Sequence, residues 1–368
     1  MKLDIRQAYA ALFFLGVVYA MLALSAANTK SITNDELVHI PAGYYYLKTG
    51  DFRMNTEHPP LIKEISAIPL VFLKPEYSTT DVSWNNNKEW ELGAKFFYRY
   101  NHNADQIVFW ARLPMILVGL IGLFYLFWLA QEIYGNNAAI LAAGLYALNP
   151  NLLAHSPLVT TDIGVMAFGI ATLYHFRKFL AKKTYRTIGL TGLFFGLTMA
   201  SKYTALYLIP IMFVMAAVYE LIVRENKHIY KLWSFYTQLA WVAIIIVISL
   251  LVVILAYGIG GAPSYLTGLA QVLYHGTAGH RGFLMGEYSE KGWISYFAIA
   301  FLVKEPIAWV VMIGLTCAAS YFLWKKEDLL EEAMLIGPAV IFFVLFSVGR
   351  IDIGVLHIFV IYPLLIVW

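Results

Sequence analysis

The chain has 368 residues, of which 60% are hydrophobic and 13% are charged, and its formal net charge at pH 7 is +3. Because soluble domains carry about 25% charged residues, this composition excludes a water-soluble enzyme, a disordered chain and a protein that coats nucleic acid. The single cysteine, Cys317, excludes a disulfide framework and a thiolate zinc site built within the chain. The composition is that of a polytopic membrane protein.

Apolar runs recur along the whole chain. A helix needs about 20 apolar residues to cross a bilayer, and over such lengths only helices satisfy their own backbone groups in lipid. We therefore expect an all-α polytopic membrane protein with about ten transmembrane helices. Residues 1–368 would form one integral-membrane catalytic domain, and the short last run suggests a chain cut from a longer one. The runs are Tyr9–Ala27, Ile107–Ala130, Ala138–Leu153, Leu158–Phe176, Ile188–Ala200, Thr204–Val223, Phe235–Tyr257, Trp293–Trp324, Ala333–Val348 and Ile353–Trp368.

The distribution of basic residues predicts the orientation of these helices. With the N-terminus in the cytoplasm, the cytoplasmic segments carry twelve Lys and Arg residues, whereas the short outer turns hold only Lys202 and Arg350. This orientation predicts a protein of the cell membrane (plasma or inner) with two large extracytoplasmic loops, residues 28–105 and 258–292. Within the first loop, the apolar stretch Leu61–Leu73 is expected to form a helix at the membrane interface.

In this orientation, ionisable side chains from distant segments all fall at the outer membrane face. Taken singly, such residues mark the boundary between lipid and water, where long side chains reach the aqueous phase. That explanation does not account for the fact that carboxylates and cations from widely separated segments all lie on one side of the membrane. Their gathering on one side indicates a functional site. These residues are Asp35, Glu36, His39, Glu57, His58, Asp162, Lys202, His280, Arg281, Arg350 and His357.

Three carboxylates are the candidates for catalysis. Asp35 and Glu36 follow the first apolar run, and paired carboxylates there can hold a metal, orient a hydroxyl or accept its proton. The alternative is a solvated turn in which Thr33 begins a helix cap. Asp162 opens a later run, where it can cap the helix and also act with Asp35. No His and Glu spacing typical of a metal site occurs, so metal dependence stays open, with Asp35 and Asp162 as the residues that would share an ion.

Two segments suggest contacts to a phosphate. Lys202 and Tyr203 lie between two apolar runs, at the level where a lipid headgroup lies. His280 and Arg281 suit the same role, because Arg binds phosphate through two parallel hydrogen bonds. The same argument applies to Arg350 and His357 near the end of the chain.

A proline-rich turn joins the first polar segment to its apolar stretch. The prolines of Glu57-His58-Pro59-Pro60 impose an extended, rigid backbone, which would fix Glu57 and His58 against the membrane. Lys63 and Glu64 follow, and the simplest interpretation of these two residues is a weak local ion pair.

Several short motifs form a recognisable series. They are Asp35-Glu36 with His39, Tyr44-Tyr45-Tyr46, Phe52, His58-Pro59-Pro60-Leu61 with Lys63, Thr161-Asp162, Ser201-Lys202-Tyr203, Gly279-His280, Gly286-Glu287, Gly292-Trp293, Tyr296, Lys304 with Pro306, Ile353-Gly354-Val355 with His357, and Tyr362-Pro363. In this order they resemble the motifs of protein O-mannosyltransferases and of the related aminoarabinose transferases of lipid A. Two positions depart from the mannosyltransferase pattern: Thr56 replaces an aspartate, and Leu356 replaces an arginine.

The resemblance implies a GT-C fold, in which a multi-helix membrane body carries a catalytic aspartate on its first outer loop. It implies a hexosyl or pentosyl transferase that moves a sugar from a polyprenyl phosphate to an acceptor hydroxyl or phosphate at the outer face. Asp35 matches the catalytic aspartate and Asp162 a second acidic position. The residues expected to bind the donor phosphate or the acceptor are His39, Glu57, His58, Lys63, Lys202, Tyr203, His280, Arg281, Arg350 and His357.

The same chemistry follows from what such a reaction requires. A lipid phosphate is already a good leaving group, so one displacement suffices and inverts the anomeric carbon. A carboxylate that deprotonates the acceptor is worth about 10²–10⁴-fold in rate, and we assign this role to Asp35. Cationic groups must stabilise the departing phosphate, and here we expect Lys202, His280 and Arg281.

Two other classes of protein stay open on the sequence alone. A transporter or flippase for a lipid-linked or anionic substrate would carry ionisable residues inside its spans, where the sequence places Arg112, Lys304, Glu305 and Glu220. A non-catalytic subunit would tolerate neutral residues at both candidate aspartates. Within the enzyme class, the sugar and the acceptor (protein, lipid A or polysaccharide) are undetermined. The expected partners are the lipid-linked sugar, the acceptor and membrane lipids, without nucleic acid.

Overall fold

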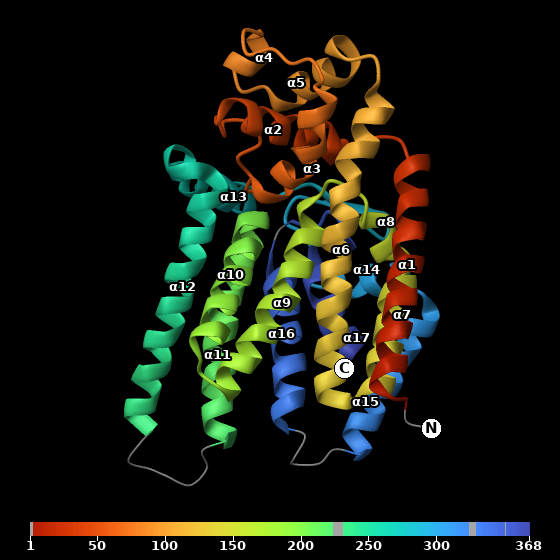
Figure 1. Ribbon diagram of the computed structural model, residues 1–368, viewed down its shortest axis with the longest axis vertical. Coiled ribbons are helices and arrows are strands. Elements are labelled where there is room, and N and C mark those ends of the chain that lie inside the picture. The colour runs from red at the N-terminus through yellow and green to blue at the C-terminus, as the bar shows by residue number, and fades with distance from the viewer. Residues whose placement is uncertain (1–2, 224–230, 324–328, 350) are drawn as a thin grey trace.

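In the computed structural model, long helices stand side by side as a bundle, and short helices cover one of its ends (Figure 1). The structure describes residues 3–223, 231–323, 329–349 and 351–368. In chain order, its elements are α1 (Ile5–Thr29), α2 (Asn34–Thr49), α3 (Leu61–Leu73), α4 (Val82–Asn85), α5 (Glu89–Lys95), the π-helix η1 (Phe96–Tyr100), α6 (Ala104–Tyr134), α7 (Asn136–Leu148), α8 (Pro150–His155), α9 (Thr161–Ala181), α10 (Tyr185–Ser201), the 3-10 helix η2 (Tyr203–Tyr207), α11 (Leu208–Val223), α12 (Lys231–Gly261), α13 (Pro263–Ala278), β1 (Gly282–Leu284), β2 (Glu287–Ser289), α14 (Tyr296–Lys304), α15 (Ile307–Leu323), α16 (Leu329–Val348), the 3-10 helix η5 (Val355–Ile361) and α17 (Tyr362–Val367).

Five helical stretches of the described residues are long and apolar enough to cross a membrane: α1, α6, η2 with α11, the second part of α12, and α16. Helices α14 and α15 pass the same test together but bend by 119° at the break between them. Pro306 stands in this break, where it cannot continue the hydrogen bonding of a helix. The protein is an integral membrane protein, as the composition predicts.

The expected number of about ten spans is not confirmed. Three of the predicted runs form helices that are short for a bilayer: α7 has 13 residues, α10 has 17 and α17 has 6. Within the described residues, five helices, or six with the bent pair, meet the length and apolarity of a span. Hydropathy alone could not separate these short apolar helices from true spans, because both bury apolar side chains.

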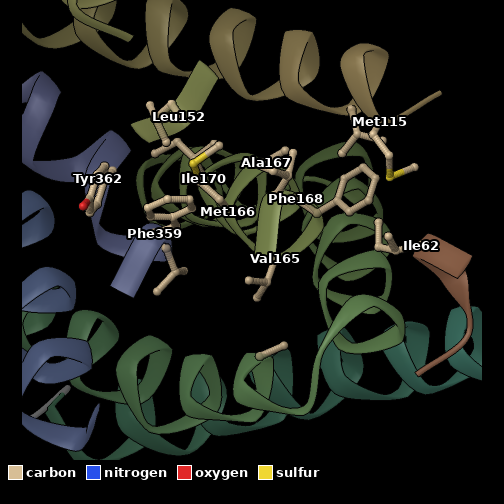
Figure 2. Packing of buried hydrophobic residues seen from close by; sticks show 14 of the residues in the cluster. Ile62, Met115, Leu152, Val165, Met166, Ala167, Phe168, Ile170, Phe359 and Tyr362 are labelled. Carbon is tan, nitrogen blue, oxygen red and sulfur yellow. The ribbon is translucent and has the colours of Figure 1, made fainter. Parts of the chain in front are cut away.

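Helix α9 lies at the centre of the bundle, and nearly all of its side chains are buried. Figure 2 shows Met166 and Phe168 of α9 among side chains from other elements, including Met115 of α6, Ile62 of α3 and Phe359 of η5. A helix enclosed in this way has little surface left for lipid. The start of α9, which carries Asp162, is therefore fixed by packing on every side.

Small residues allow α10 and α12 to pack closely. A Cβ at Gly196 would lie 2.5 Å from the Cβ of Val252, and one at Gly192 would lie 2.6 Å from Ile248. Ser249 Oγ also donates a hydrogen bond of 2.9 Å to the carbonyl oxygen of Gly192. In membranes, helix association depends on such close contacts and interhelical hydrogen bonds, since lipid tails are as apolar as the side chains.

The two long polar segments predicted from the sequence fold at the same end of the bundle (Figure 1). In residues 28–105, α3 spans Leu61–Leu73, the same residues as the apolar stretch. Whether α3 lies at a membrane interface stays a prediction. In residues 258–292, α13 is followed by an antiparallel hairpin of β1 and β2, in which Phe283 pairs with Tyr288. This small sheet is the one departure from an all-α fold in the described residues.

Candidate active site

A cavity of about 1230 Å³ lies at this end of the bundle. Its walls come from α2, from the turn before α3, from α5, and from residues of η2, α13, α16 and η5. The structure thus brings together segments that are far apart in the sequence. Eight of the site residues predicted from the sequence line the cavity: Asp35, His39, Glu57, His58, Lys202, Tyr203, His280 and His357.

Asp35 lies in the first turn of α2, where its side chain is exposed at the cavity. The helix starts here because Thr33 caps it. The backbone N–H and the hydroxyl of Thr33 donate to one carboxylate oxygen of Glu36 at 2.9 and 3.0 Å. A carboxylate in a first turn is also stabilised by the helix dipole. The helix cap predicted as an alternative to a site therefore exists, and it places Asp35 on the cavity wall.

Glu36 is completely buried and does not line the cavity. Arg112 of α6 binds both of its carboxylate oxygens, with Nε at 2.8 Å and Nη2 at 2.6 Å. The other three N–H groups of Arg112 donate to the carbonyl oxygens of Ala27, Lys30 and Ser31 at 2.6–3.0 Å. All five donors of the guanidinium are used. Arg112 thereby joins the end of α1 to the start of α2, directly beside Asp35.

The peptide groups on either side of Val159 connect α2 to the segment that leads into α9. The N–H of Val159 donates to Glu36 at 3.2 Å, and the imidazole Nδ1 of His39 bonds the carbonyl oxygen of Val159 at 2.8 Å. Burial lowers the pKa of His39, while the carboxylates of Asp35 and Asp162 act to raise it. Both candidate aspartates therefore lie within electrostatic range of one imidazole.

Asp162 and Lys202 form a buried ion pair, with Nζ 2.6 Å from one carboxylate oxygen. Asp162 lies in the first turn of α9, and Lys202 follows the last residue of α10. Only Lys202 of the two lines the cavity. An ammonium group has three donors, so Lys202 can hold Asp162 and still donate to a molecule in the cavity.

Three histidines on the cavity wall carry a buried ring nitrogen without a hydrogen-bond partner among the described residues: Nδ1 of His58, Nδ1 of His280 and Nε2 of His357. Buried polar atoms in native proteins are almost always paired, with protein, water or ligand. Burial, together with the nearby His39 and Lys202, holds the pKa of His58 well below its usual value. The imidazole of His58 is therefore neutral near pH 7.

The turn that carries Glu57 is tied to α13. Glu57 lies 3.4 Å from Nδ1 of His275, and the hydroxyl of Thr56 bonds the side chain of Gln271. The hydroxyl of Tyr203 donates to the carbonyl oxygen of Thr56 at 3.3 Å. Tyr203 therefore supports the cavity wall with its hydroxyl in addition to lining the cavity.

Lys63 is fully buried and does not line the cavity. The expected ion pair with Glu64 is not formed. Instead, Nζ donates to the carbonyl oxygens of Asn55 and His58 at 2.7 Å, to Oδ1 of Asn55 at 3.2 Å and to the hydroxyl of Tyr46 at 3.0 Å. Burial lowers the pKa of Lys63 to about 7. Lys63 holds the turn that presents Glu57 and His58, from behind the cavity wall.

Two predicted basic residues have other positions. Arg281 is exposed, lies 4.6 Å above the ring of Tyr288 in the hairpin and does not line the cavity. Arg350 lies outside the described residues. Within the described part of the chain, no group of three or more His, Cys, Asp or Glu side chains is arranged to hold a metal ion.

Several cavity residues were not expected from the sequence. Asn87, Glu89 and Trp90 lie on or next to α5, and Gln271 and His275 lie on α13. The cluster of acidic and aromatic residues between the first two spans was the available signal. It gave no position relative to Asp35, because that depends on how the segment folds back over the bundle.

The comparisons with known proteins agree with this architecture. Residues 104–255 match the family model described as dolichyl-phosphate-mannose-protein mannosyltransferase. No curated protein gives a significant match to the sequence. Among solved structures, the fold is similar to that of ArnT from Cupriavidus metallidurans bound to undecaprenyl phosphate, with a TM-score of 0.65 at 15% identity, and to its apo state, with a TM-score of 0.63 at 16% identity. The matches cover 96% and 98% of this chain, but 58% and 59% of the ArnT chains.

A third structure, the apo oligosaccharyltransferase of Archaeoglobus fulgidus, matches with a TM-score of 0.53 at 13% identity, over 99% of this chain and 50% of that one. The chain therefore spans between half and three fifths of the length of these structures. At such identities the likeness establishes the fold. The resemblance predicted from the sequence motifs is confirmed: residues 104–255 match the mannosyltransferase family model, and the chain has the GT-C fold of ArnT and of the archaeal oligosaccharyltransferase.

Proposed function

We propose that the protein is a membrane glycosyltransferase that moves a sugar from a polyprenyl phosphate carrier to an acceptor, at the extracytoplasmic face of the cell membrane. One observation carries this proposal. A single cavity is lined by an exposed carboxylate, Asp35, by Lys202, and by three histidines whose ring nitrogens have no hydrogen-bond partner among the described residues. A base for an acceptor and donors for a phosphate are what such a transfer requires.

The composition of the cavity also supports a lipid-linked donor. Tyr207 of η2 and Leu345 and Phe346 of α16 line it, and both elements belong to stretches that can span a membrane. The lining therefore continues from charged groups to apolar side chains at the level of the spans. A polyprenyl phosphate has this same sequence of chemistry, with a charged head and a hydrocarbon chain. ArnT, which has the same fold, has been solved with undecaprenyl phosphate bound.

The proposed mechanism is a single displacement. The acceptor hydroxyl oxygen attacks the anomeric carbon and its proton passes to the carboxylate of Asp35. The bond between the anomeric carbon and the phosphate oxygen breaks, and its electron pair stays on the phosphate. Lys202 and His280 donate to the phosphate as its charge grows, which is the interaction that lowers the barrier. One displacement inverts the configuration of the anomeric carbon.

Asp162 has a supporting role in this proposal. Its carboxylate is 2.6 Å from Nζ of Lys202 and holds that ammonium group at the cavity. A metal ion shared by Asp35 and Asp162 does not fit the described residues. Lys202 already forms an ion pair with Asp162, and no third His, Cys, Asp or Glu side chain is placed to complete a set of metal ligands. The sugar, hexose or pentose, is left to the experiment.

The test compares two aspartates that stand in similar positions. Asp35 and Asp105 are both exposed and both lie in the first turn of a helix, but only Asp35 lines the cavity. The rate of sugar transfer is measured in proteoliposomes supplied with radiolabelled polyprenyl phosphate sugars. We expect Asp35→Asn to lower this rate by about 10²-fold or more, and we expect Asp105→Asn to leave it unchanged. Mass spectrometry of the lipid and protein products identifies what receives the label.

Two outcomes would overturn the proposed function. Full transfer by Asp35→Asn would remove the base from the mechanism. Movement of the lipid-linked sugar across the membrane without transfer would identify a transporter. Two of the four ionisable residues that favoured a transporter are engaged in closed networks: Arg112 with Glu36, and Glu305 with Asn149, Asn151 and Tyr362.

A further inference from the structure

The cavity has a second wall whose chemistry differs from that of the phosphate side. We call it the α5 wall and define it by Asn55 and Glu57 from the turn before α3, and by Asn87, Lys88, Glu89, Trp90 and Glu91 at α5. The mechanism above uses none of these residues. They nevertheless line the same cavity as Asp35, so a molecule bound to them would share that cavity with the proposed base.

Trp90 is the unusual member of this wall. It lines the cavity with 47% of its surface exposed, and no aromatic ring of the described residues packs against it. The neighbouring Trp84, by contrast, is buried and stacks on Tyr45 at 4.7 Å. The faces of aromatic side chains in proteins are normally covered by other groups, because removing their large apolar area from water is favourable. An uncovered indole in a polar cavity offers a flat apolar surface to a ligand.

The polar groups around Trp90 are planar amides and carboxylates. Asn87 stands three residues before it, is exposed, and its side-chain amide makes no hydrogen bond to the described residues. Asn87 and Asn55 both have left-handed backbones, with φ of 54° and 50°. Lys63 holds Asn55 in this conformation through two hydrogen bonds. Non-glycine residues held in the left-handed region of backbone φ and ψ angles cluster at functional sites.

The charge of the α5 wall limits what it can bind. Its carboxylates are Glu57, Glu89 and Glu91, and its cation, Lys88, lies 3.5 Å from Glu91. An acceptor phosphate would meet net negative charge here, which is unfavourable. A polyol fits: its C–H faces pack on an indole, and its hydroxyls donate to carboxylates and accept from amides.

We infer that the α5 wall binds a saccharide acceptor, so that the acceptor hydroxyl presented to Asp35 belongs to a glycan rather than to a protein or to a lipid phosphate. This inference rests on the proposed function for the role of Asp35. Trp90 supplies the stacking surface. Asn87 and Glu91 supply hydrogen bonds to ring hydroxyls.

Binding of acceptors tests this inference separately from catalysis. The full chain in nanodiscs is applied to a printed array that carries neutral oligosaccharides, phosphorylated glycolipid headgroups and serine- and threonine-containing peptides. We expect retention on neutral oligosaccharides, reduced about tenfold by Trp90→Ala and restored in part by Trp90→Tyr. The matched control is Trp110→Ala, since Trp110 is 42% exposed on α6 and does not line the cavity.

The same nanodiscs are titrated with undecaprenyl phosphate, measured by native mass spectrometry. We expect Trp90→Ala to bind this lipid as the unchanged protein does, which also shows that the variant is folded. Preferential binding of peptides or phosphorylated headgroups, equal binding by Trp90→Ala and Trp110→Ala, or no retention on any oligosaccharide would each overturn the saccharide inference. Retention of oligosaccharides without binding of undecaprenyl phosphate would instead overturn the proposed function.

Discussion

The pair of Arg112 and Glu36 is the contact whose removal has the clearest expected consequence. Arg112→Met leaves the carboxylate of Glu36 buried without a positive charge, and it leaves the carbonyl oxygens of Ala27, Lys30 and Ser31 without their donor. Both side chains of the pair are 0% exposed, so water cannot replace the lost contacts. The ends of α1 and α2 lose their connection, and Asp35 lies at that connection.

The magnitude follows from this burial. Removing one partner of a buried ion pair costs about 3–5 kcal/mol, which lowers the melting temperature of a large chain by about 5–10 °C. The matched control is Arg53→Met. Arg53 is also paired with a carboxylate, Asp51, at 2.6 Å, but the two side chains are 40% and 33% exposed. Exposed pairs are worth about 0–1 kcal/mol, so this variant should melt within about 2 °C of the unchanged protein.

Thermal unfolding in detergent, followed by intrinsic fluorescence, measures both variants. Equal melting temperatures for Arg112→Met and Arg53→Met would refute the assignment of Arg112 as the connection between α1 and α2. The double variant Arg112→Met with Glu36→Leu removes both charges, so it should lose less stability than Arg112→Met alone. A larger loss in the double variant would show that the hydrogen bonds that Glu36 accepts from Thr33 and Val159 outweigh the cost of its unpaired charge.

Three further predictions concern the packing and the charges. Burial lowers the pKa of Lys63 from 10.5 in the unfolded chain to about 7 in the folded protein. Between these pH values the unfolded chain binds one proton more than the folded protein, so the free energy of unfolding rises with pH. The melting temperature of the wild-type protein should therefore rise with pH relative to that of Lys63→Met, and parallel curves for the two proteins would contradict this prediction. Gly196→Leu should push α10 away from α12 and lower the yield of folded protein measured by size-exclusion chromatography. Gly189→Leu should not, because no atom of the described residues lies within 4 Å of a Cβ placed there. Lys202→Gln should weaken binding of undecaprenyl phosphate about tenfold in native mass spectrometry, with Lys88→Gln on the α5 wall unchanged.

Much of the fold could be predicted where a local signal decides it. Thr33 to Glu36 have the pattern of a helix cap, and α2 starts there. The apolar stretch Leu61–Leu73 coincides with α3. The gathering of ionisable residues at one face followed from counting basic residues, and seven of them line one cavity.

What depends on long-range packing could not be predicted. Arg112 stood out as a charge inside a span, but its partner is 76 residues away in the chain. Lys63 has a carboxylate beside it in the sequence and bonds instead to the turn at Asn55 and His58. Composition likewise could not distinguish α9, which is enclosed by other helices, from a span that faces lipid.

The contact at Val159 has an evolutionary consequence. Both of its hydrogen bonds use main-chain atoms, so they can form with any buried apolar residue at position 159 that has an N–H. Neutral drift among apolar residues is permitted there, while proline, which lacks an N–H, is forbidden. The link between α2 and the segment that leads to Asp162 thus runs through the backbone, at a position where apolar substitutions would give no hint of it.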